Sequence, residues 1–247
     1  MNFGIYAPSY KRGHLCKTHK YIPEVTYVVR ESEKADYDEV HDNIWIVPDS
    51  AQGNLCRIRN YILDNAPENN IVLLDDDINF LGRWNGNVQA KLSGTEALNM
   101  IQEGMTLAED LGVVFWGLNC LSDKGAFREY TPFGTCQYIG GPFQAHCKNP
   151  LRYDERIYLK EDYDMTLQVL NRYRKNLRLN MYHYSCDQAT LSGGCADYRS
   201  IAREMEHNDM LRKKWGSSIV KFDNSNKSKK IKTYDINPIL KIPITGV

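Results

Sequence analysis

Short apolar runs alternate with segments of helical periodicity along most of this chain. Runs rich in β-branched and aromatic residues predict strands at residues 3–7, 25–30, 44–47, 71–74, 113–118 and 178–184. Apolar residues that recur every three or four positions predict helices at residues 55–66, 95–112, 161–174 and 200–215. This order predicts an α/β fold with a mainly parallel central sheet flanked by helices, and with ligands at the carboxyl ends of the strands.

The pattern contains no internal repeat and no obvious domain break. Residues 123–150 are rich in glycine, proline and aromatic residues, so we expect loops and short strands there. A chain of 247 residues is long enough for one large domain. We expect that domain to cover residues 1–217, with residues 218–247 forming a basic C-terminal extension that packs on it or trails from it.

Composition and charge narrow the possible partners. The sequence is 42% hydrophobic and 25% charged, as in ordinary globular proteins, and its 31 basic and 31 acidic residues cancel. No global charge therefore attracts nucleic acid or a membrane surface, and any polyanion must be bound by a local patch. The lysine-rich tail is the best candidate for such a patch, although such runs are usually just solvated surface. Its lysines are Lys221, Lys227, Lys229, Lys230 and Lys232.

The sequence favours a cytoplasmic protein. It has no run of 18 apolar residues that could span a membrane, and its N-terminus resembles a first strand more than a signal peptide. The seven cysteines are scattered without a C-x-x-C motif, which favours thiols in a reducing compartment over disulfides or a zinc site. We thus expect a cytoplasmic location, in the host cytoplasm if a phage encodes the chain.

Three consecutive carboxylates, Asp75-Asp76-Asp77, follow directly on the apolar run of residues 71–74. Like charges a few ångströms apart repel one another, and burial increases the cost. A hard divalent cation with oxygen ligands would remove this repulsion. The alternative is a solvated acidic loop after a strand, because acidic residues are common in turns.

A second acidic pair, Glu161-Asp162, opens the helix predicted at residues 161–174. Acidic residues in the first turn of a helix are stabilised by the helix dipole, so capping alone explains the pair. The functional alternative is a general base that faces a substrate hydroxyl.

Other candidate ligand contacts lie in loops and on one helix. Residues 8–12 (Pro-Ser-Tyr-Lys-Arg) follow the first strand and could offer backbone N–H groups, a hydroxyl and two cations to a nucleotide. Taken alone, this segment is more typical of a turn whose basic side chains are solvated. Arg57 and Arg59 point in different directions on their helix, so one could reach a phosphate and the other solvent. Gly140-Gly141 would allow a ligand to approach the backbone closely, or form a plain turn.

His183 could complete a metal site, although a lone histidine on a strand is more often packed and hydrogen-bonded. The G-x-x-x-x-G-K-[ST] phosphate loop is missing from the sequence, which argues against that class of nucleotide-hydrolysing enzyme. No glycine-rich dinucleotide fingerprint follows the first strand either, so a nicotinamide enzyme is not expected.

Taken in order, these segments resemble the nucleotide-sugar glycosyltransferases of the GT-A fold. The resemblance covers roughly residues 3–200. It is carried by residues 7–12, 57–60, 73–77, 140–141 and 161–162. Within that fold, the short chain and the Gly193-Gly194 segment resemble phage enzymes that glycosylate hydroxymethylated pyrimidines in DNA, including the TET-associated glycosyltransferases.

The resemblance implies a role for each matching residue. Asp77 would ligate Mn²⁺ or Mg²⁺, with His183 as a further metal or phosphate contact, and Asp162 would act as the base beside Glu161. The donor, a nucleotide-sugar and most simply a UDP-sugar, would be bound by Pro8, Ser9, Tyr10, Arg12, Glu31 (or Glu33), Arg59, Asp75, Asp76 and Gly141.

The reaction implied is metal-dependent transfer of a sugar to 5-hydroxymethylcytosine or a related base in duplex DNA. A base at Asp162 implies inversion at the sugar carbon, and Lys227, Lys229, Lys230 and Lys232 would contact the DNA. Two alternatives stay open. One is a transferase acting on a surface glycan or a lipid-linked acceptor, and the other is a non-catalytic nucleotide-binding module.

Overall fold

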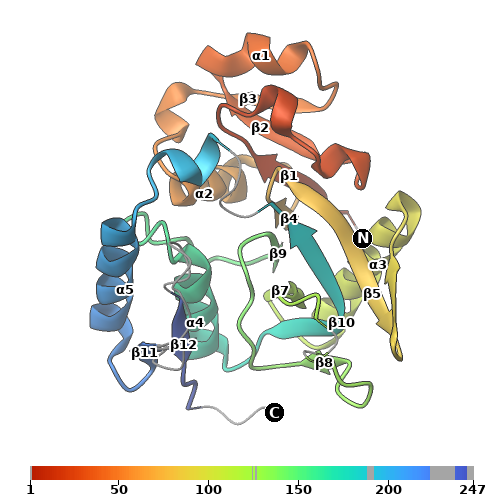
Figure 1. Cartoon of the computed structure of the whole chain (residues 1–247), viewed down its shortest axis with the longest axis vertical. Helices are drawn as coiled ribbons and strands as arrows, with labels where there is room; N and C mark the ends of the chain where they lie inside the picture. Colours follow the sequence, from red (N-terminus) through yellow and green to blue (C-terminus); the bar gives the residue numbers. More distant parts are fainter. Residues whose placement is uncertain (1, 124, 126, 188–191, 223–236, 244–247) are drawn as a thin grey trace.

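The computed structural model describes residues 2–123, 125, 127–187, 192–222 and 237–243 (Figure 1). Within them, a ten-stranded mixed sheet has the order β3-β2-β1-β4-β9-β7-β10-β5-β6, with β8 paired to β10. The strands are β1 (Gly4–Pro8), β2 (Thr26–Arg30), β3 (Ile44–Val47), β4 (Asn70–Leu74), β5 (Ile78–Asn85), β6 (Val88–Lys91), β7 (Phe115–Asn119), β8 (Phe133–Gly134), β9 (Phe143–Cys147) and β10 (Leu177–Cys186).

Most strands of the sheet run in the same direction. β1 pairs in parallel with β2 and β4, β2 with β3, and β7 with β10. β9 lies antiparallel between β4 and β7, so those two strands also point the same way. The carboxyl ends of β1, β4 and β10 consequently reach one edge of the sheet. The predicted α/β fold with a mainly parallel sheet flanked by helices is confirmed.

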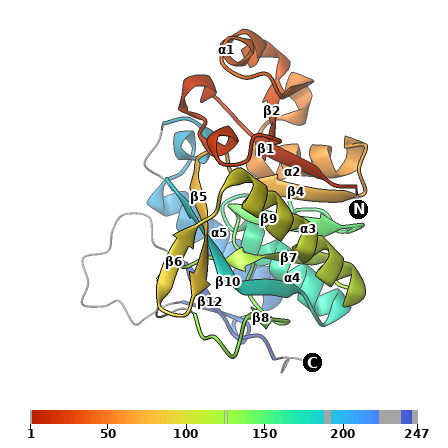
Figure 2. The same cartoon turned by 90° about the vertical axis from the view of Figure 1, so that its right-hand side faces the viewer.

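Four of the five α-helices in the described residues fall close to their predicted positions, and α1 was not predicted. The five are α1 (Lys34–Asp38), α2 (Leu55–Asn65), α3 (Gly94–Asp110), α4 (Glu161–Tyr173) and α5 (Ile201–Trp215). Ser93 and Glu96 form a capping box that begins α3, and the Ser200 side chain caps α5. Figure 2 shows α3 on the viewer's side and α5 on the far side of the molecule.

The alternation of side chains along the buried strand β4 gives the sheet two apolar faces. Val72 and Leu74 belong to the core that includes Met105 of α3, whereas Leu73 belongs to the core that includes Ile58 of α2. Successive residues of a strand point to opposite faces, so a strand covered on both sides reads as a continuous apolar run. This double burial fixes the end of β4, and with it the position of the acidic run that follows.

A small two-stranded sheet ends the described chain. β11 (Val220–Phe222) pairs antiparallel with β12 (Pro238–Leu240), and Val220 and Leu240 pack with Tyr163 of α4 and Leu211 of α5. The division into residues 1–217 and 218–247 stays a prediction. The tail lysines Lys227, Lys229, Lys230 and Lys232 lie outside the described residues.

In the part of the chain that the structure describes, every helix is too short or too polar to cross a membrane.

Candidate active site

A cleft of about 1370 Å³ opens where the carboxyl ends of β1 and β4 meet the N-terminus of α4. Its lining comes from many separate parts of the sequence, and the predicted site residues within it come from four of them. The predicted site residues that line it are Pro8, Ser9, Tyr10, Arg12, Asp75, Asp76, Asp77, Gly141, Glu161 and Asp162.

Asp76 is the structural anchor of the loop after β1. Ser9 Oγ donates a hydrogen bond of 2.5 Å to Asp76 Oδ2, and Arg12 Nη1 donates one of 2.9 Å to Oδ1. The Asp76 carbonyl also accepts a 2.8 Å bond from the Lys17 backbone N–H. Because Asp76 is buried and both its oxygens are engaged, its main contribution is to shape the loop.

Arg12 fastens a distant segment of the chain onto the same loop. Its Nε donates to the Ser192 carbonyl at 3.0 Å and its Nη2 to the Gly193 carbonyl at 3.1 Å. The Gly194 N–H donates to the Tyr10 carbonyl at 2.9 Å. Gly193 has a φ of +80°, and a Cβ there would lie 2.9 Å from the Tyr10 carbonyl oxygen, so this close approach requires glycine.

Arg59 joins the two acidic groups from beneath the cleft. It is completely buried, and its Nη2 donates to Asp75 Oδ1 at 3.2 Å and to the Gly141 carbonyl at 2.9 Å. Its Nη1 donates to Glu161 Oε1 at 3.1 Å. Arg57, two residues earlier, instead forms an exposed pair with Glu155 at 3.7 Å. The two arginines therefore point in different directions, as predicted, but Arg59 meets carboxylates.

Asp77 differs from Asp75 and Asp76 because, within the described residues, it has a buried carboxylate oxygen without a hydrogen-bond partner. Its Oδ2 lies 3.4 Å from Arg12 Nη1, whereas the buried Oδ1 has no hydrogen-bond partner within the described residues. Burial, together with the charges of Asp75 and Asp76, raises the pKa of Asp77 to about 7. A buried oxygen in this condition is what a bound cation would satisfy.

The chemistry of the surrounding donors fits a cation. Carboxylate oxygens of Asp75 and Asp77 and the sulfur of Cys186 all lie within 4.8 Å of one another. Burial is also the largest cause that raises the pKa of Asp75, opposed by Arg59. Two nearby carboxylates, one of them with an unpartnered oxygen, form a donor set suited to a divalent ion.

His183 lies away from this group. Its Nε2 is 3.0 Å from Gln89 Nε2, and its ring packs between Phe80 and Trp84, with both ring centroids 6.0 Å away. A Cβ at Gly82 on the facing strand β5 would lie 2.3 Å from this ring. The structure therefore matches the packed alternative for His183, and it does not bring the imidazole to the carboxylates.

Glu33, and not Glu31, makes the contacts that tie this segment to the loop after β1. Glu33 Oε2 accepts a 2.9 Å bond from the Lys11 N–H, and Oε1 accepts from Arg30 at 2.6 Å. Glu31 is exposed, and neither glutamate is among the residues that line the cleft. Both residues are within one 3₁₀ turn (Glu31–Glu33), so the sequence alone does not separate them.

Asp162 lines the cleft, and its hydrogen-bond donors in the described part of the chain are all neutral. Its Oδ2 accepts from the Tyr138 hydroxyl and from the Gly141 N–H at 3.2 Å, and its Oδ1 accepts from the Tyr163 N–H at 2.8 Å. Glu161 is different, because burial and the adjacent Asp162 charge outweigh Arg59 and raise the pKa of Glu161 to about 8. The two members of this acidic pair thus have different surroundings.

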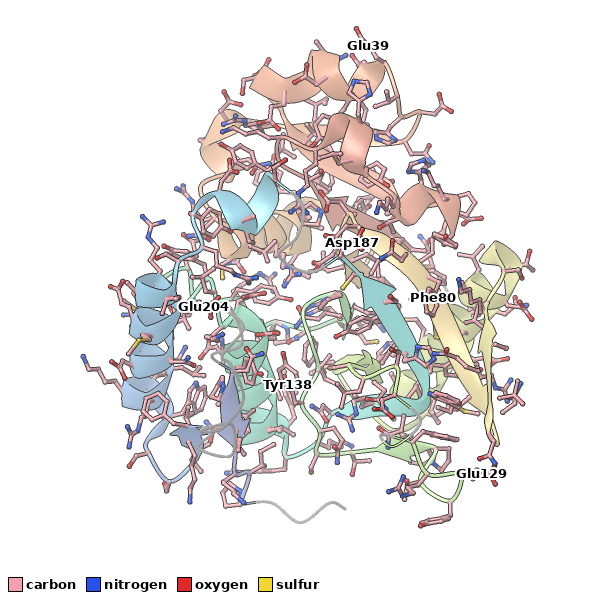
Figure 3. All side chains as sticks on the ribbon, viewed as in Figure 1. Glu39, Phe80, Glu129, Tyr138, Asp187 and Glu204 are labelled. Atoms are coloured by element: carbon pink, nitrogen blue, oxygen red, sulfur yellow. The ribbon has the colours of Figure 1, made fainter. Side chains whose placement is uncertain are left out.

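Among the cleft residues that were not predicted from the sequence are Tyr138, Arg178 and Tyr184. Tyr138, labelled in Figure 3, stacks on Tyr163 of α4, and its carbonyl accepts from Arg178 of β10 at 3.4 Å. Burial lowers the pKa of Arg178, and among the described residues no carboxylate lies within 4.0 Å of its guanidinium. No local motif marks these positions: Arg178 and Tyr184 lie on β10, and Tyr138 lies in the loop before β9.

Comparison with known structures gives distant relatives. The mannosyltransferase PcManGT from Pyrobaculum calidifontis, solved with GDP-Man and Mn²⁺, is 12% identical with a TM-score of 0.52 and matches 85% of this chain and 64% of its own. Residues 1–349 of S. aureus TarS are 14% identical with a TM-score of 0.47, over 74% of this chain and 60% of that one. The chain thus spans less than two thirds of either relative.

A third relative covers nearly the whole chain. Glucosyl-3-phosphoglycerate synthase from Mycobacterium tuberculosis, solved with Mg²⁺ and UDP, is 8% identical with a TM-score of 0.48 and matches 99% of this chain and 89% of its own. These relatives are GT-A glycosyltransferases, and the mannosyltransferase match supports the fold assignment. No curated protein sequence matched this chain.

The sequence itself matches a family description over most of its length. Residues 3–194 match the TET-Associated Glycosyltransferase family. This match sets aside the alternative of a non-catalytic module. The chain belongs to the TET-associated glycosyltransferase family and is a glycosyltransferase of the GT-A fold.

Proposed function

We propose that this enzyme transfers a sugar from a nucleotide-sugar, in a metal-dependent reaction, to the hydroxymethyl group of a modified pyrimidine in DNA. One observation carries the proposal: a single cleft contains two acidic centres with different surroundings. Among the described residues, Asp77 has an unpartnered buried oxygen beside Asp75, and the hydrogen-bond donors to Asp162 are all neutral. The first centre suits a cation and the second suits a base.

Asp75 and Asp77 would hold Mn²⁺ or Mg²⁺ in this enzyme, because hard divalent cations prefer carboxylate oxygens. When bound, such an ion neutralises the donor's diphosphate and stabilises the leaving group. The mannosyltransferase relative was solved with GDP-Man and Mn²⁺, which supports this class of donor and ion.

The nucleotide would bind on the β1 side of the cleft. Pro8 and Tyr10 line it there, and the Arg30 guanidinium lies 4.7 Å from the centroid of the Tyr10 ring. A UDP-sugar is the simplest donor for this position. In our proposal Ser9, Arg12 and Asp76 act mainly by holding the loop in shape, since their polar groups already bond one another.

Asp162 would act as the base for the acceptor hydroxyl. Its partners are an O–H and two N–H groups, so no neighbouring cation pairs with its carboxylate. The acceptor oxygen forms a bond to C1 of the sugar while its proton passes to Asp162 and the bond between C1 and the diphosphate oxygen breaks. This single displacement inverts the configuration at C1 and releases the nucleoside diphosphate.

The DNA acceptor is supported by the family and by one feature of the cleft. A hydroxymethyl group on C5 of a pyrimidine projects into the major groove, where a protein can reach it. Arg178 could face a phosphate or a base edge, because it lines the cleft and pairs with no carboxylate among the described residues. The tail lysines Lys227, Lys229, Lys230 and Lys232 are proposed as backbone contacts, and a DNA substrate implies the cytoplasm.

The deciding experiment incubates the protein and Mn²⁺ with duplex DNA that contains 5-hydroxymethylcytosine and a panel of nucleotide-sugars. Nucleoside mass spectrometry should show the mass of one sugar added to the modified base, and none on matched DNA with unmodified cytosine. Absence of any gain with every donor would sink the DNA proposal. Donor hydrolysis without transfer to DNA would point to another acceptor.

The other acceptor class favoured by an observation is a glycan or lipid-linked acceptor at a membrane surface. Helix α5 carries Arg212 and Lys213 in its last turn and exposes Ile201 (43%) and Met205 (53%). Basic helices with exposed apolar residues can lie on membranes. Co-sedimentation with anionic liposomes, together with no binding to DNA, would favour this alternative.

A further inference from the structure

The carboxyl end of β10 lies beside the acidic run because β10 pairs with β5, the strand that follows this run. β5 begins at Ile78, immediately after Asp77, and β10 runs antiparallel to it. Ser185 pairs with Phe80 whereas Cys186 pairs with Ile78, so the register shifts between residues 185 and 186. An irregularity of this kind re-aims a side chain at the end of a strand. The Cys186 sulfur accordingly lies within 4.8 Å of carboxylate oxygens of Asp75 and Asp77.

We propose that the Cys186 thiolate is a third protein ligand of the cation held by Asp75 and Asp77. This inference rests on the proposed function and adds a sulfur donor to its metal site. An independent observation supports it, namely that the Asp77 side chain is nine-tenths buried and that its Oδ1 lacks a hydrogen-bond partner within the described residues. A buried acceptor without a partner beside a thiol indicates a missing ligand at that point.

The other possible ligands near the end of β10 are held by side chains outside the carboxylate cluster. Asp187 accepts hydrogen bonds from Lys17 and from Asn79, the latter at 2.8 Å, and Figure 3 shows it at the end of β10. The His183 ring is held by Gln89 and the aromatic residues of β5. The strand therefore presents sulfur to the carboxylates in place of imidazole.

A set of two oxygens and one sulfur has a distinct metal preference. Thiolates bind Co²⁺, Zn²⁺ and Cd²⁺ strongly, whereas Mg²⁺ prefers oxygen ligands alone. We therefore expect the protein to bind Mn²⁺ and Co²⁺ in preference to Mg²⁺. Because metal binding displaces the thiol proton, it should also protect Cys186 from alkylation.

The test is a titration of the full-length protein with Co²⁺, followed by absorption spectroscopy. Wild type should develop a thiolate-to-cobalt charge-transfer band that saturates at one equivalent. Cys186→Ser should lose this band and bind Co²⁺ at least ~10-fold more weakly. Cys136→Ser is the matched control, because Cys136 is not among the residues that line the cleft, and it should keep the full band.

Two further measurements separate the possible failures. Iodoacetamide labelling read by peptide mass spectrometry should show Cys186, and not Cys136, protected by Mn²⁺. A saturable Co²⁺ spectrum without a thiolate band, or an unchanged band in Cys186→Ser, would overturn the sulfur ligand and leave the carboxylate site standing. If neither Co²⁺ nor Mn²⁺ binds the wild-type protein at all, even with UDP present, both this inference and the metal-dependent function fail.

Discussion

The two acidic regions of the cleft use the same residue types in opposite ways. In the run after β4, Asp76 has cationic and hydroxyl partners for both oxygens, whereas Asp77 keeps one oxygen unpartnered within the described residues. At the start of α4, Glu161 faces a buried guanidinium, whereas Asp162 faces a hydroxyl and two N–H groups. A carboxylate's position in a motif thus says little about its role, and the identity of its partners says much more.

Arg59 connects these two regions. Its guanidinium donates hydrogen bonds to Asp75 in one region and to Glu161 in the other, which lie 16 and 102 residues away in the sequence. The arginine fixes one acid in each region and leaves Asp77 and Asp162 outside its reach. The comparison can therefore be tested by changing the acids and the arginine one at a time.

The largest effect is expected for Asp162→Asn. The amide cannot take the acceptor's proton, so kcat should fall roughly 10²- to 10⁴-fold while the dissociation constants for Mn²⁺ and UDP stay unchanged. Steady-state kinetics and calorimetry measure the two quantities. Asp110→Asn, on the exposed end of α3, is the control and should behave like wild type. Equal loss of metal binding in Asp162→Asn would contradict separate roles for the two regions.

Arg59→Met should cause the largest loss of stability. It leaves Asp75 and Glu161 without their buried cation, so the free energy of unfolding should fall by about 3–5 kcal/mol in urea denaturation. The matched variant Arg57→Met removes only an exposed ion pair and should cost no more than about 1 kcal/mol. Similar losses of unfolding free energy in the two variants would show that the buried bonds from Arg59 to the two acidic regions do not stabilise the fold.

Glu161 predicts how stability depends on pH. Its pKa is about 8 in the folded protein and near 4.5 when unfolded, so between these values the folded state binds more protons than the unfolded state. The free energy of unfolding should therefore fall as pH rises from about 5 to 8, by a few kcal/mol at ~1.4 kcal/mol per pKa unit. Urea denaturation at several pH values measures this slope. Glu161→Gln should make the slope shallower, leaving the part that Asp77 contributes through its own raised pKa, and an unchanged slope would contradict the role of Glu161.

The smallest effect separates two neighbours in one run. Asp76→Asn weakens the bonds from Ser9 and Arg12, so we expect a loss of about 1–3 kcal/mol in thermal or urea unfolding. Asp77→Asn should be neutral or stabilising without metal, because it replaces an acid that is costly to ionise, yet it should abolish Mn²⁺ binding. If Asp77→Asn lost stability and Asp76→Asn lost Mn²⁺ binding, Asp77 would be the residue that anchors the loop and Asp76 the metal ligand.

The sequence predicts the regular elements well because their signals are local. The apolar run at residues 71–74 and the stripe of α3 identify buried elements, and the acidic run and the Glu161-Asp162 pair lie on the cleft that the fold creates. β5 was missed because it begins directly after the carboxylates, where the pattern resembles a loop. These signals explain why the fold class was predictable from short segments.

Contacts between distant strands were not predictable in the same way. Cys186 in place of His183 near the carboxylates depends on a register shift between β10 and β5, and Glu33 in place of Glu31 depends on one 3₁₀ turn. Arg178 and Tyr138 meet only because β10 passes beside the loop before β9. A shift of one residue reverses which side chains face a site, and a single sequence does not specify such a shift.

The contact between Arg12 and the carbonyls of Ser192 and Gly193 also bears on how the molecule is made. These partners are 180 and 181 residues apart, so most of the chain must leave the ribosome before the guanidinium can reach them. Until then the loop after β1 lacks its contacts with Ser192 and Gly193. The strands of the sheet can pair earlier, but the cleft closes among the last steps of folding, and nascent chains that stop short of residue 193 should expose it to proteases.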